Sequence, residues 1–150
     1  MKRILVPVDF SSTTDAVIGV GAALAKSLGA ELFLLHVAQP EPEFITYEPG
    51  PASVRQAVAR EISEEHRKLH ALDRALEAQG LTVTSLVIQG YIVEKIIQEI
   101  ERLQIDLVVM GSHGHGALHH LLLGSVSEGV MRKTTCPVLI VPSIKENQST

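Results

Sequence analysis

Glycine, histidine and serine residues crowd one stretch of the sequence, residues 111–125, which reads GSHGHGALHHLLLGS. The stretch follows an apolar run at 107–110 and ends in a serine where a helical pattern begins. Glycine lets the backbone approach a ligand closely, exposed backbone N–H groups face an anion, and the first turn of a helix adds partial positive charge. The pattern therefore predicts a phosphate-binding loop, and hence a nucleotide ligand, rather than a catalytic centre.

The same stretch holds four histidines, His113, His115, His119 and His120. Neutral imidazoles ligate transition metals, so these side chains could converge on one ion. The stretch contains no cysteine or carboxylate, however, and its spacing matches no standard zinc pattern. Solvated loop residues, or residues that face phosphate, are the alternative, and metal buffering is one hypothesis for the protein.

Nucleophilic catalysis has little support in the sequence. Ser11, Ser112 and Ser125 do not lie in a Gly-x-Ser-x-Gly turn, and no orienting acid accompanies the serine and histidines of the loop. Cys136 precedes a proline next to an apolar run, so we expect a buried, unreactive thiol. His36 ends another apolar run, and we expect a hydrogen-bonded core residue there.

Composition and charge exclude several classes of protein. The chain has 150 residues, no Trp, 13 Lys and Arg against 17 Asp and Glu, and a net charge of -4. Without a basic run or aromatic platforms, we expect no binding to nucleic acid or to an anionic membrane surface. No run approaches the roughly 18 apolar residues of a membrane span, and the start has the pattern of a strand rather than a signal peptide. The single cysteine allows no internal disulfide, and we expect a cytoplasmic protein.

Apolar runs of strand length alternate with helical patterns along the chain. Strands are predicted at residues 4–8, 32–37, 83–88, 107–110 and 138–141. The helices between them have apolar stripes, of which the first contains Val17, Val20, Leu24 and Leu28 and ends at Gly29. The near-continuous apolar run at 32–37 is typical of a strand that is buried on both faces, as in parallel sheets.

This alternation predicts a single α/β domain over residues 1–143, followed by a polar tail at 144–150. The fold is expected to be an open, Rossmann-like parallel sheet of five strands in the order 3-2-1-4-5, with helices on both faces. Asp9, Val37 and Gly90 come at or just after strand ends, so they should meet the glycine loop at one edge of the sheet. The Pro-rich and Glu-rich segment 39–52 is longer than a usual connection, and we expect a mobile binding loop there.

Several motifs in this order resemble the universal stress protein family, and the resemblance covers nearly the whole chain. The spacing Gly111-x2-Gly114-x9-Gly124-Ser125 is similar to the ATP-binding loop of that family. The other matching motifs are Pro7-Val8-Asp9-Phe10-Ser11, His36-Val37, the run VMGSHG at 109–114, Gly124-Ser125-Val126 and Cys136-Pro137-Val138. The glycine loop places the chain with the family's ATP-binding group, and the implied fold is that of the adenine nucleotide alpha hydrolases.

The resemblance implies a set of nucleotide contacts. Backbone N–H groups of the glycine loop and the Ser125 hydroxyl would contact phosphates or ribose, and Val37 would offer backbone groups to the adenine edge. Asp9 would hydrogen-bond the nucleoside or help hold the water shell of Mg²⁺, and a helix-capping role is its structural alternative. The implied nucleotide-binding residues are Pro7, Asp9, Val37, Met110, Gly111, His113, Gly114, Gly124, Ser125 and Val126.

One departure from the family concerns the end of the third strand. The family often has Gly-x-Pro there, whereas this chain has Gly90-Tyr91-Ile92 and lacks the proline. The start of the following helix should be less fixed, and Tyr91 could reach the site.

The function implied by the resemblance is that of a homodimeric stress-response module. Its ligand would be ATP, ADP or AMP with Mg²⁺, and an unknown protein partner would read the bound state. Because the chain lacks a Walker lysine and an arginine finger, we expect at most slow hydrolysis. A slow ATPase or nucleotide-transferring enzyme, and a nucleotide-free dimeric interaction protein, are the alternatives.

The last strand, Val138–Val141, should lie at an edge of the sheet. An exposed apolar edge promotes aggregation unless something covers it. A symmetric dimer that pairs two such edges is the expected solution, and the resemblance implies the same arrangement.

Overall fold

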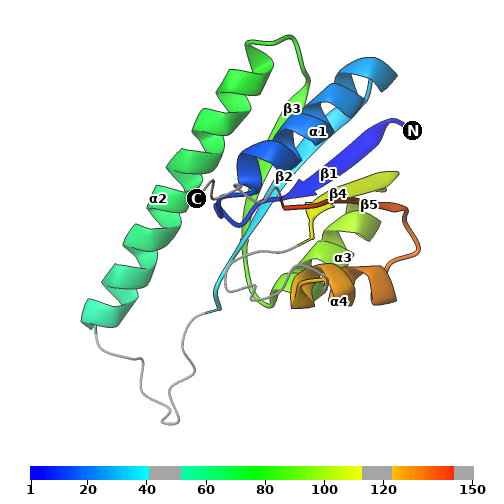
Figure 1. Cartoon of the computed structure of the whole chain (residues 1–150). Coiled ribbons are helices and arrows are strands. Elements are labelled where there is room, and N and C mark those ends of the chain that lie inside the picture. The colour runs from blue at the N-terminus through cyan, green and yellow to red at the C-terminus, as the bar shows by residue number, and fades with distance from the viewer. Residues whose placement is uncertain (41–51, 113–122, 144–150) are drawn as a thin grey trace, which may run out of the picture.

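The computed structural model describes residues 1–40, 52–112 and 123–143. The elements alternate between strand and helix along the chain (Figure 1). In order they are β1 (Arg3–Pro7), α1 (Thr14–Leu28), β2 (Glu31–Ala38), α2 (Ala52–Glu77), β3 (Val83–Gln89), α3 (Ile92–Arg102), β4 (Leu107–Gly111), α4 (Ser125–Lys133) and β5 (Val138–Val141).

The five strands form one parallel sheet in the order β3-β2-β1-β4-β5, which confirms the predicted topology. β1 lies at the centre of the sheet, between β2 and β4. From β1 the chain adds β2 and then β3 on one side, and it then crosses to the other side of β1 to add β4 and β5. Ligands of open α/β sheets bind at such a switch point, outside the carboxyl ends of the strands.

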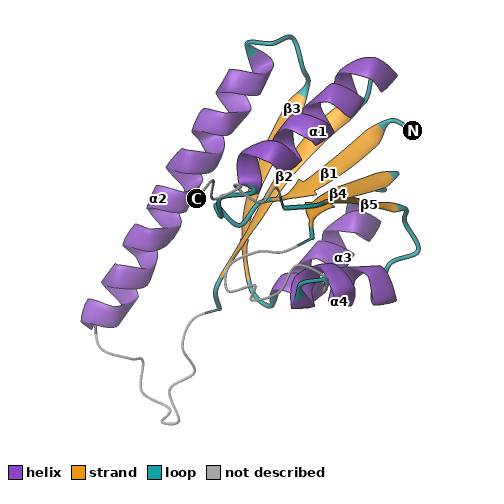
Figure 2. Cartoon of the chain, viewed as in Figure 1, coloured by secondary structure: helices purple, strands orange, loops and turns teal. Residues whose placement is uncertain are grey.

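Helices cover both faces of the sheet (Figure 2). α1 and α2 pack over one apolar cluster, which includes Ile4, Val6 and Leu34. α3 and α4 pack over a second cluster, which includes Leu5 and Leu35. Seven consecutive residues of β2 are buried, as the apolar run predicted for a strand covered on both sides.

The apolar stripe predicted for the first helix is wrong in part. Leu28 is 48% exposed, and Val20 and Leu24 are only partly buried. The face that packs on the sheet consists instead of Val17, Ile18 and the small residues Gly21, Ala22 and Ala25. Small side chains let α1 approach β1 closely, and the helix ends as expected at Gly29, which has a left-handed backbone (φ 62°).

The close approach of α1 to β1 gives a prediction with an internal control. A Cβ at Gly21 would lie 2.6 Å from Cγ2 of Val6, a stiff side chain with no exposed surface, whereas a Cβ at Gly19 would meet nothing within 4 Å. Helix propensity favours alanine at both sites by about 0.5–1 kcal/mol. Gly19→Ala should therefore stabilise the protein, and Gly21→Ala should destabilise it by about 1–3 kcal/mol through overpacking. Urea unfolding of both variants checks this, and equal stabilisation by both would contradict the packing.

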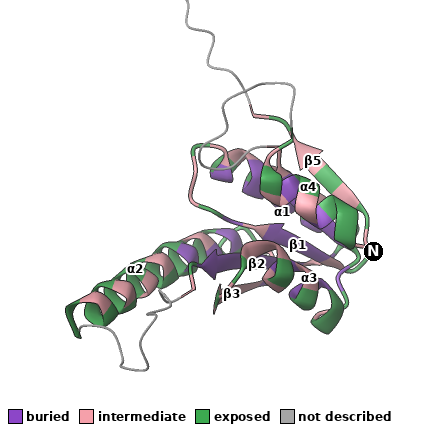
Figure 3. Cartoon of the chain, turned by 90° about the horizontal axis from the view of Figure 1, so that it is seen from below, coloured by how far each residue is buried: buried purple, intermediate pink, exposed green. Residues whose placement is uncertain are grey.

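α2 is attached to the sheet mainly through its C-terminal half. Leu69, Asp73 and Leu76 are its buried residues, and the Ser85 hydroxyl of β3 donates a hydrogen bond of 2.7 Å to Asp73 Oδ2. The N-terminal half runs beyond the sheet with its surface largely exposed (Figure 3). This overhang places one side of α2 over the carboxyl ends of the strands, where it can form part of a site.

Candidate functional site

A cavity of about 820 Å³ opens at the carboxyl ends of the strands, at the predicted switch point. Its described lining comes from the ends of β1, β2 and β4, the first turns of α1, α3 and α4, and one side of α2. The site is therefore built from segments that are far apart in the sequence and that the sheet brings together.

Most of the residues expected at the site line this cavity. Eight of the expected residues, from the first quarter and the last third of the sequence, lie in its lining: Pro7, Asp9, Val37, Met110, Gly111, Gly124, Ser125 and Val126. The remaining two, His113 and Gly114, lie outside the described residues, as do His115, His119, His120 and nearly all of the segment 39–52. The tail at 144–150 also lies outside them.

The start of α4 forms one wall of the cavity. Gly124 precedes the helix with an extended backbone (φ -63°, ψ 157°), and its N–H donates to the carbonyl of Ser112 at 2.6 Å. The Ser127 hydroxyl in the first turn donates a 2.7 Å hydrogen bond to the carbonyl of Gly111, at the end of β4. These bonds fix the first turn of α4 beside β4, and the first backbone N–H groups of a helix have no partner within it. The wall is thus suited to an anionic group.

Asp9 has a structural role at the turn between β1 and α1. Its Oδ1 accepts hydrogen bonds from the Ser11 N–H at 3.0 Å and from the Thr14 hydroxyl at 3.3 Å. The carboxylate thereby orders the turn ahead of α1, in keeping with the capping alternative, while Thr13 at the cap position makes no side-chain capping bond. The same turn carries Asp9 into the cavity lining.

α2 contributes four charged residues to the lining that sequence reasoning missed, Glu61, Glu64, Glu65 and Lys68. Their spacing places them on one face of the helix, next to the apolar stripe that packs on the sheet. That spacing was the available signal, but an overhanging helix could not be inferred from it. Lys68 is the one lysine or arginine in the described lining, and three carboxylates lie with it on this wall, so the α2 wall is acidic overall.

His36 connects this acidic wall to the sheet. The side chain is buried as expected, and its Nδ1 lies 2.7 Å from the carbonyl oxygen of Val8. Its Nε2 lies 3.0 Å from Glu65 Oε2, an ion-pair distance at which the two groups are not aligned for a hydrogen bond. The imidazole also packs against Phe10, with ring centroids 4.7 Å apart.

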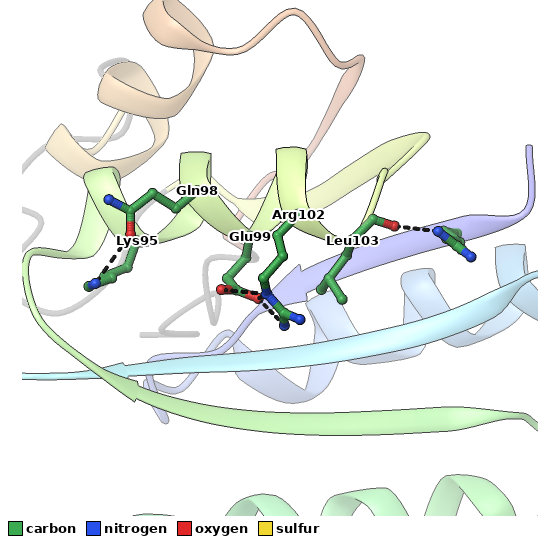
Figure 4. Close-up of polar contacts among 6 residues, drawn as sticks. Lys95, Gln98, Glu99, Arg102 and Leu103 are labelled. Carbon is green, nitrogen blue, oxygen red and sulfur yellow. Dashed lines mark hydrogen bonds and ion pairs between the residues drawn. The ribbon is translucent and has the colours of Figure 1, made fainter.

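The described residues offer no preformed metal centre and no arginine in the cavity lining. Glu99 of α3, a buried carboxylate outside the lining, is paired with Arg102 on the same helix (Figure 4). Arg102 Nε lies 2.9 Å from Glu99 Oε2, and the hydrogen bonds to this carboxylate raise the pKa of Arg102. Arg102 is thus engaged in a structural pair.

Two further expectations are corrected by the structure. Cys136 is only half-buried; partial burial raises the pKa of its thiol, which argues against an activated nucleophile. Tyr91 is 62% exposed and is not among the residues that line the cavity, so it does not reach the site. The side chain stands at the cap of α3, where the backbone is extended and Gly90 precedes it.

A family model described as the universal stress protein family matches residues 1–142 of the chain. Universal stress protein MJ0577 of Methanocaldococcus jannaschii is 31% identical over 152 residues, which cover 93% of this chain and 94% of the relative. A solved structure of MJ0577 has a TM-score of 0.78 at 32% identity and covers 96% of this chain and 97% of its own.

Other solved structures share the fold at lower identity. UspA, a universal stress protein from Lactobacillus plantarum, has a TM-score of 0.81 at 21% identity, covering 93% of this chain and 97% of its own. A universal stress protein solved in complex with cAMP has a TM-score of 0.70, also at 21% identity, and covers 95% of this chain and 98% of its own. The single α/β domain with its 3-2-1-4-5 sheet is thus the fold of these proteins.

Proposed function

Because the chain belongs to the universal stress protein family, we propose that it binds an adenine nucleotide and acts as a nucleotide-dependent regulatory module in a stress response. The observation that carries the proposal is the start of α4, which is fixed at the end of β4 and opens into the cavity at the switch point. Helix starts in this position bind phosphate groups in α/β proteins. A protein of the same fold has been solved with cAMP, which is itself an adenine nucleotide.

The nucleotide lies with its phosphates at Gly124, Ser125 and Val126 in this proposal. The ribose and adenine then extend toward the ends of β1 and β2, where Pro7 and Val37 line the cavity. The acidic side of α2 disfavours a second position for the phosphates, because the carboxylates there would repel them. Mg²⁺ would arrive on the phosphates, with Asp9 either in contact with its water shell or hydrogen-bonded to the nucleoside.

Calorimetric titration tests the proposal. ATP, ADP and AMP, each with Mg²⁺ present, are titrated into the purified protein, with GTP as the comparison ligand. We expect micromolar affinity for at least one adenine nucleotide, that is about -8 kcal/mol, and weaker binding of GTP. Absence of binding by all three adenine nucleotides would overturn the proposal.

Slow or absent turnover is part of the same proposal. The described lining has no arginine to neutralise charge on a transferring phosphoryl group. A turnover of about 1 s⁻¹ or more would favour the enzyme alternative. If the protein is a binding module, a partner protein recognises the nucleotide-bound state.

A cytoplasmic setting is consistent with the single cysteine. Within the described residues, no helix has the length and apolar character needed to cross a membrane.

A homodimer through β5 completes the proposal. Within the part of the chain that the structure describes, β5 pairs with β4 alone, and its residue Leu139 is 39% exposed, so this edge has backbone groups without a strand partner beside an apolar side chain. Leu139→Asp should weaken self-association roughly tenfold or more, because each copy would bring a desolvated charge to the interface. Leu28→Asp, at an exposed position on α1, is the matched control. Sedimentation at several concentrations measures the effect; a chain that is monomeric before mutation would rule out this dimer.

A further inference from the structure

Both ring nitrogens of His36 face oxygen acceptors. Nδ1 lies 2.7 Å from the Val8 carbonyl oxygen, which can only accept a hydrogen bond, so Nδ1 is the donor. Nε2 lies 3.0 Å from the carboxylate of Glu65 on α2. Both atoms of this second contact are buried, and neither makes a hydrogen bond among the described residues. The first contact therefore fixes one ring proton on Nδ1, and the second places a carboxylate at ion-pair distance from Nε2.

A neutral imidazole cannot interact favourably with both the Val8 carbonyl oxygen and the Glu65 carboxylate. With its one proton on Nδ1, it leaves the electron-rich Nε2 at 3.0 Å from a carboxylate oxygen with no opposite charge between them, and this contact is repulsive. An extra proton, on the imidazole or shared with Glu65, turns the contact into an ion pair in a poorly solvated place. The separation of 3.0 Å thus fits the protonated pair and not the neutral imidazole beside an ionised carboxylate.

Among the described residues, this pair is one of two polar or ring contacts between the overhanging half of α2 and other elements. No residue before Leu69 is buried in that helix. Among the described residues, the polar and ring contacts between residues 52–68 and other elements are Glu65 with His36, and Lys68 Nζ at 5.5 Å from the centre of the Phe10 ring. Phe10 packs in turn on His36. The C-terminal half of α2 is attached to the sheet by Leu69, Asp73 and Leu76. Loss of the His36 contact should therefore affect the position of the overhanging half and not that of the C-terminal half.

We propose that His36 is a positioning residue whose extra proton holds the overhanging half of α2 against the strand ends, so that this proton and the ligand of the cavity stabilise each other's binding. The link to the ligand rests on the function proposed above. Because α2 forms one wall of the cavity, a bound nucleotide favours the docked helix, and the docked helix favours the protonated pair. Linkage is reciprocal, so protonation raises nucleotide affinity by the same factor.

Charged groups line the cavity together with His36. They are Glu61, Glu64 and Glu65 from α2, Asp9 from the β1–α1 turn, and Lys68, and of these Glu65 lies at ion-pair distance from the imidazole. The neighbouring lining from α1 and α3 is Thr13, Thr14, Val17, Ile92 and Ile96, and the β3 partner in register is Val87; none of these titrates. The ion pair with Glu65 requires the protonated imidazole, so the docked helix should be favoured at pH 6 over pH 8.

Hydrogen exchange of the ligand-free 150-residue chain tests the positioning role without any nucleotide. After correction for intrinsic rates, the amides of residues 52–68 should lose protection between pH 6 and pH 8, while those of 69–77 should not. Glu65→Gln should remove this pH dependence, because an amide can donate to the neutral ring. His66→Gln, at an exposed position on the same helix, should leave it in place. Equal protection at both pH values in the unmutated protein would overturn the inference.

Calorimetry with ATP at the two pH values tests the link to the ligand. We expect roughly fivefold tighter binding at pH 6 than at pH 8, and a ratio near one in Glu65→Gln and His36→Gln. Titration of ATP itself contributes equally to all variants and is removed by this comparison. A pH ratio that persists in both variants would contradict the link. If ATP fails to bind while the exchange effect is present, the proposed function fails and the positioning of α2 by His36 stands.

Discussion

Ser125→Asp should weaken adenine nucleotide binding about 100-fold and leave the fold intact. The new carboxylate would stand at the first position of α4, where the phosphates are proposed to lie. Two charges about 4 Å apart repel by roughly 1–4 kcal/mol at the effective dielectric constants of a protein surface, and a phosphate group has more than one charge. The same carboxylate stabilises the helix itself, since acidic side chains are favourable in a first turn. The variant therefore separates binding from folding.

Ser125→Asn is the matched control, because it has nearly the same shape without the charge. Its affinity should fall by tenfold or less, which reflects the loss of one hydroxyl contact. Calorimetry gives the affinities, and thermal unfolding without ligand checks that both variants fold. If Ser125→Asp bound ATP as tightly as Ser125→Asn, the phosphates would have to lie elsewhere.

Leu34→Ala and Leu35→Ala should each lower the free energy of unfolding by about 2–5 kcal/mol. These neighbours in β2 point to opposite faces of the sheet, and both are essentially inaccessible to solvent. Leu34 belongs to the cluster under α1 and α2, and Leu35 to the cluster under α3 and α4. Each substitution leaves a cavity in a different half of the core. Because a domain of this kind is stable by about 5–15 kcal/mol in total, either change is a large fraction of it.

Urea unfolding measures these two losses, and Leu28→Ala is the control. Leu28 is a leucine of the same size that is 48% exposed, so its truncation should change stability by about 0.5 kcal/mol or less. A small effect at either Leu34 or Leu35 would mean that one face of the sheet is open. That outcome would contradict the two-layer covering of β2.

The order of the strands and the bounds of most elements followed from the sequence. A continuous apolar run in β2 is typical of burial on both faces, and right-handed crossovers restrict the order of parallel strands. The face of α1 was less predictable. Large apolar residues marked the stripe, yet Leu28 is exposed at the end of the helix. The buried face includes small residues, because the helix approaches Val6 closely at Gly21. Which face of a helix is buried therefore depends on the shape of the surface on which the helix packs.

The candidate site was predictable where it lies at strand ends. Asp9, Val37 and Gly124 line one cavity because parallel strands and the start of a following helix meet at the same edge. The wall from α2 was not predictable, because Glu61 and Glu65 have the composition of any solvated helix face. Their position depends on how far α2 extends beyond the sheet, and the contact of Glu65 with His36 spans 29 residues of sequence (65 − 36 = 29).

A crystal structure of the 150-residue chain grown with ATP and Mg²⁺ tests adenine-nucleotide binding at the switch point. We expect a phosphate oxygen within hydrogen-bond distance, about 2.7–3.2 Å, of a backbone N–H in the first turn of α4. We also expect the adenine at the ends of β1 and β2, beside Val37. A nucleotide seated elsewhere on the protein, or an empty cavity at saturating ATP, would contradict it.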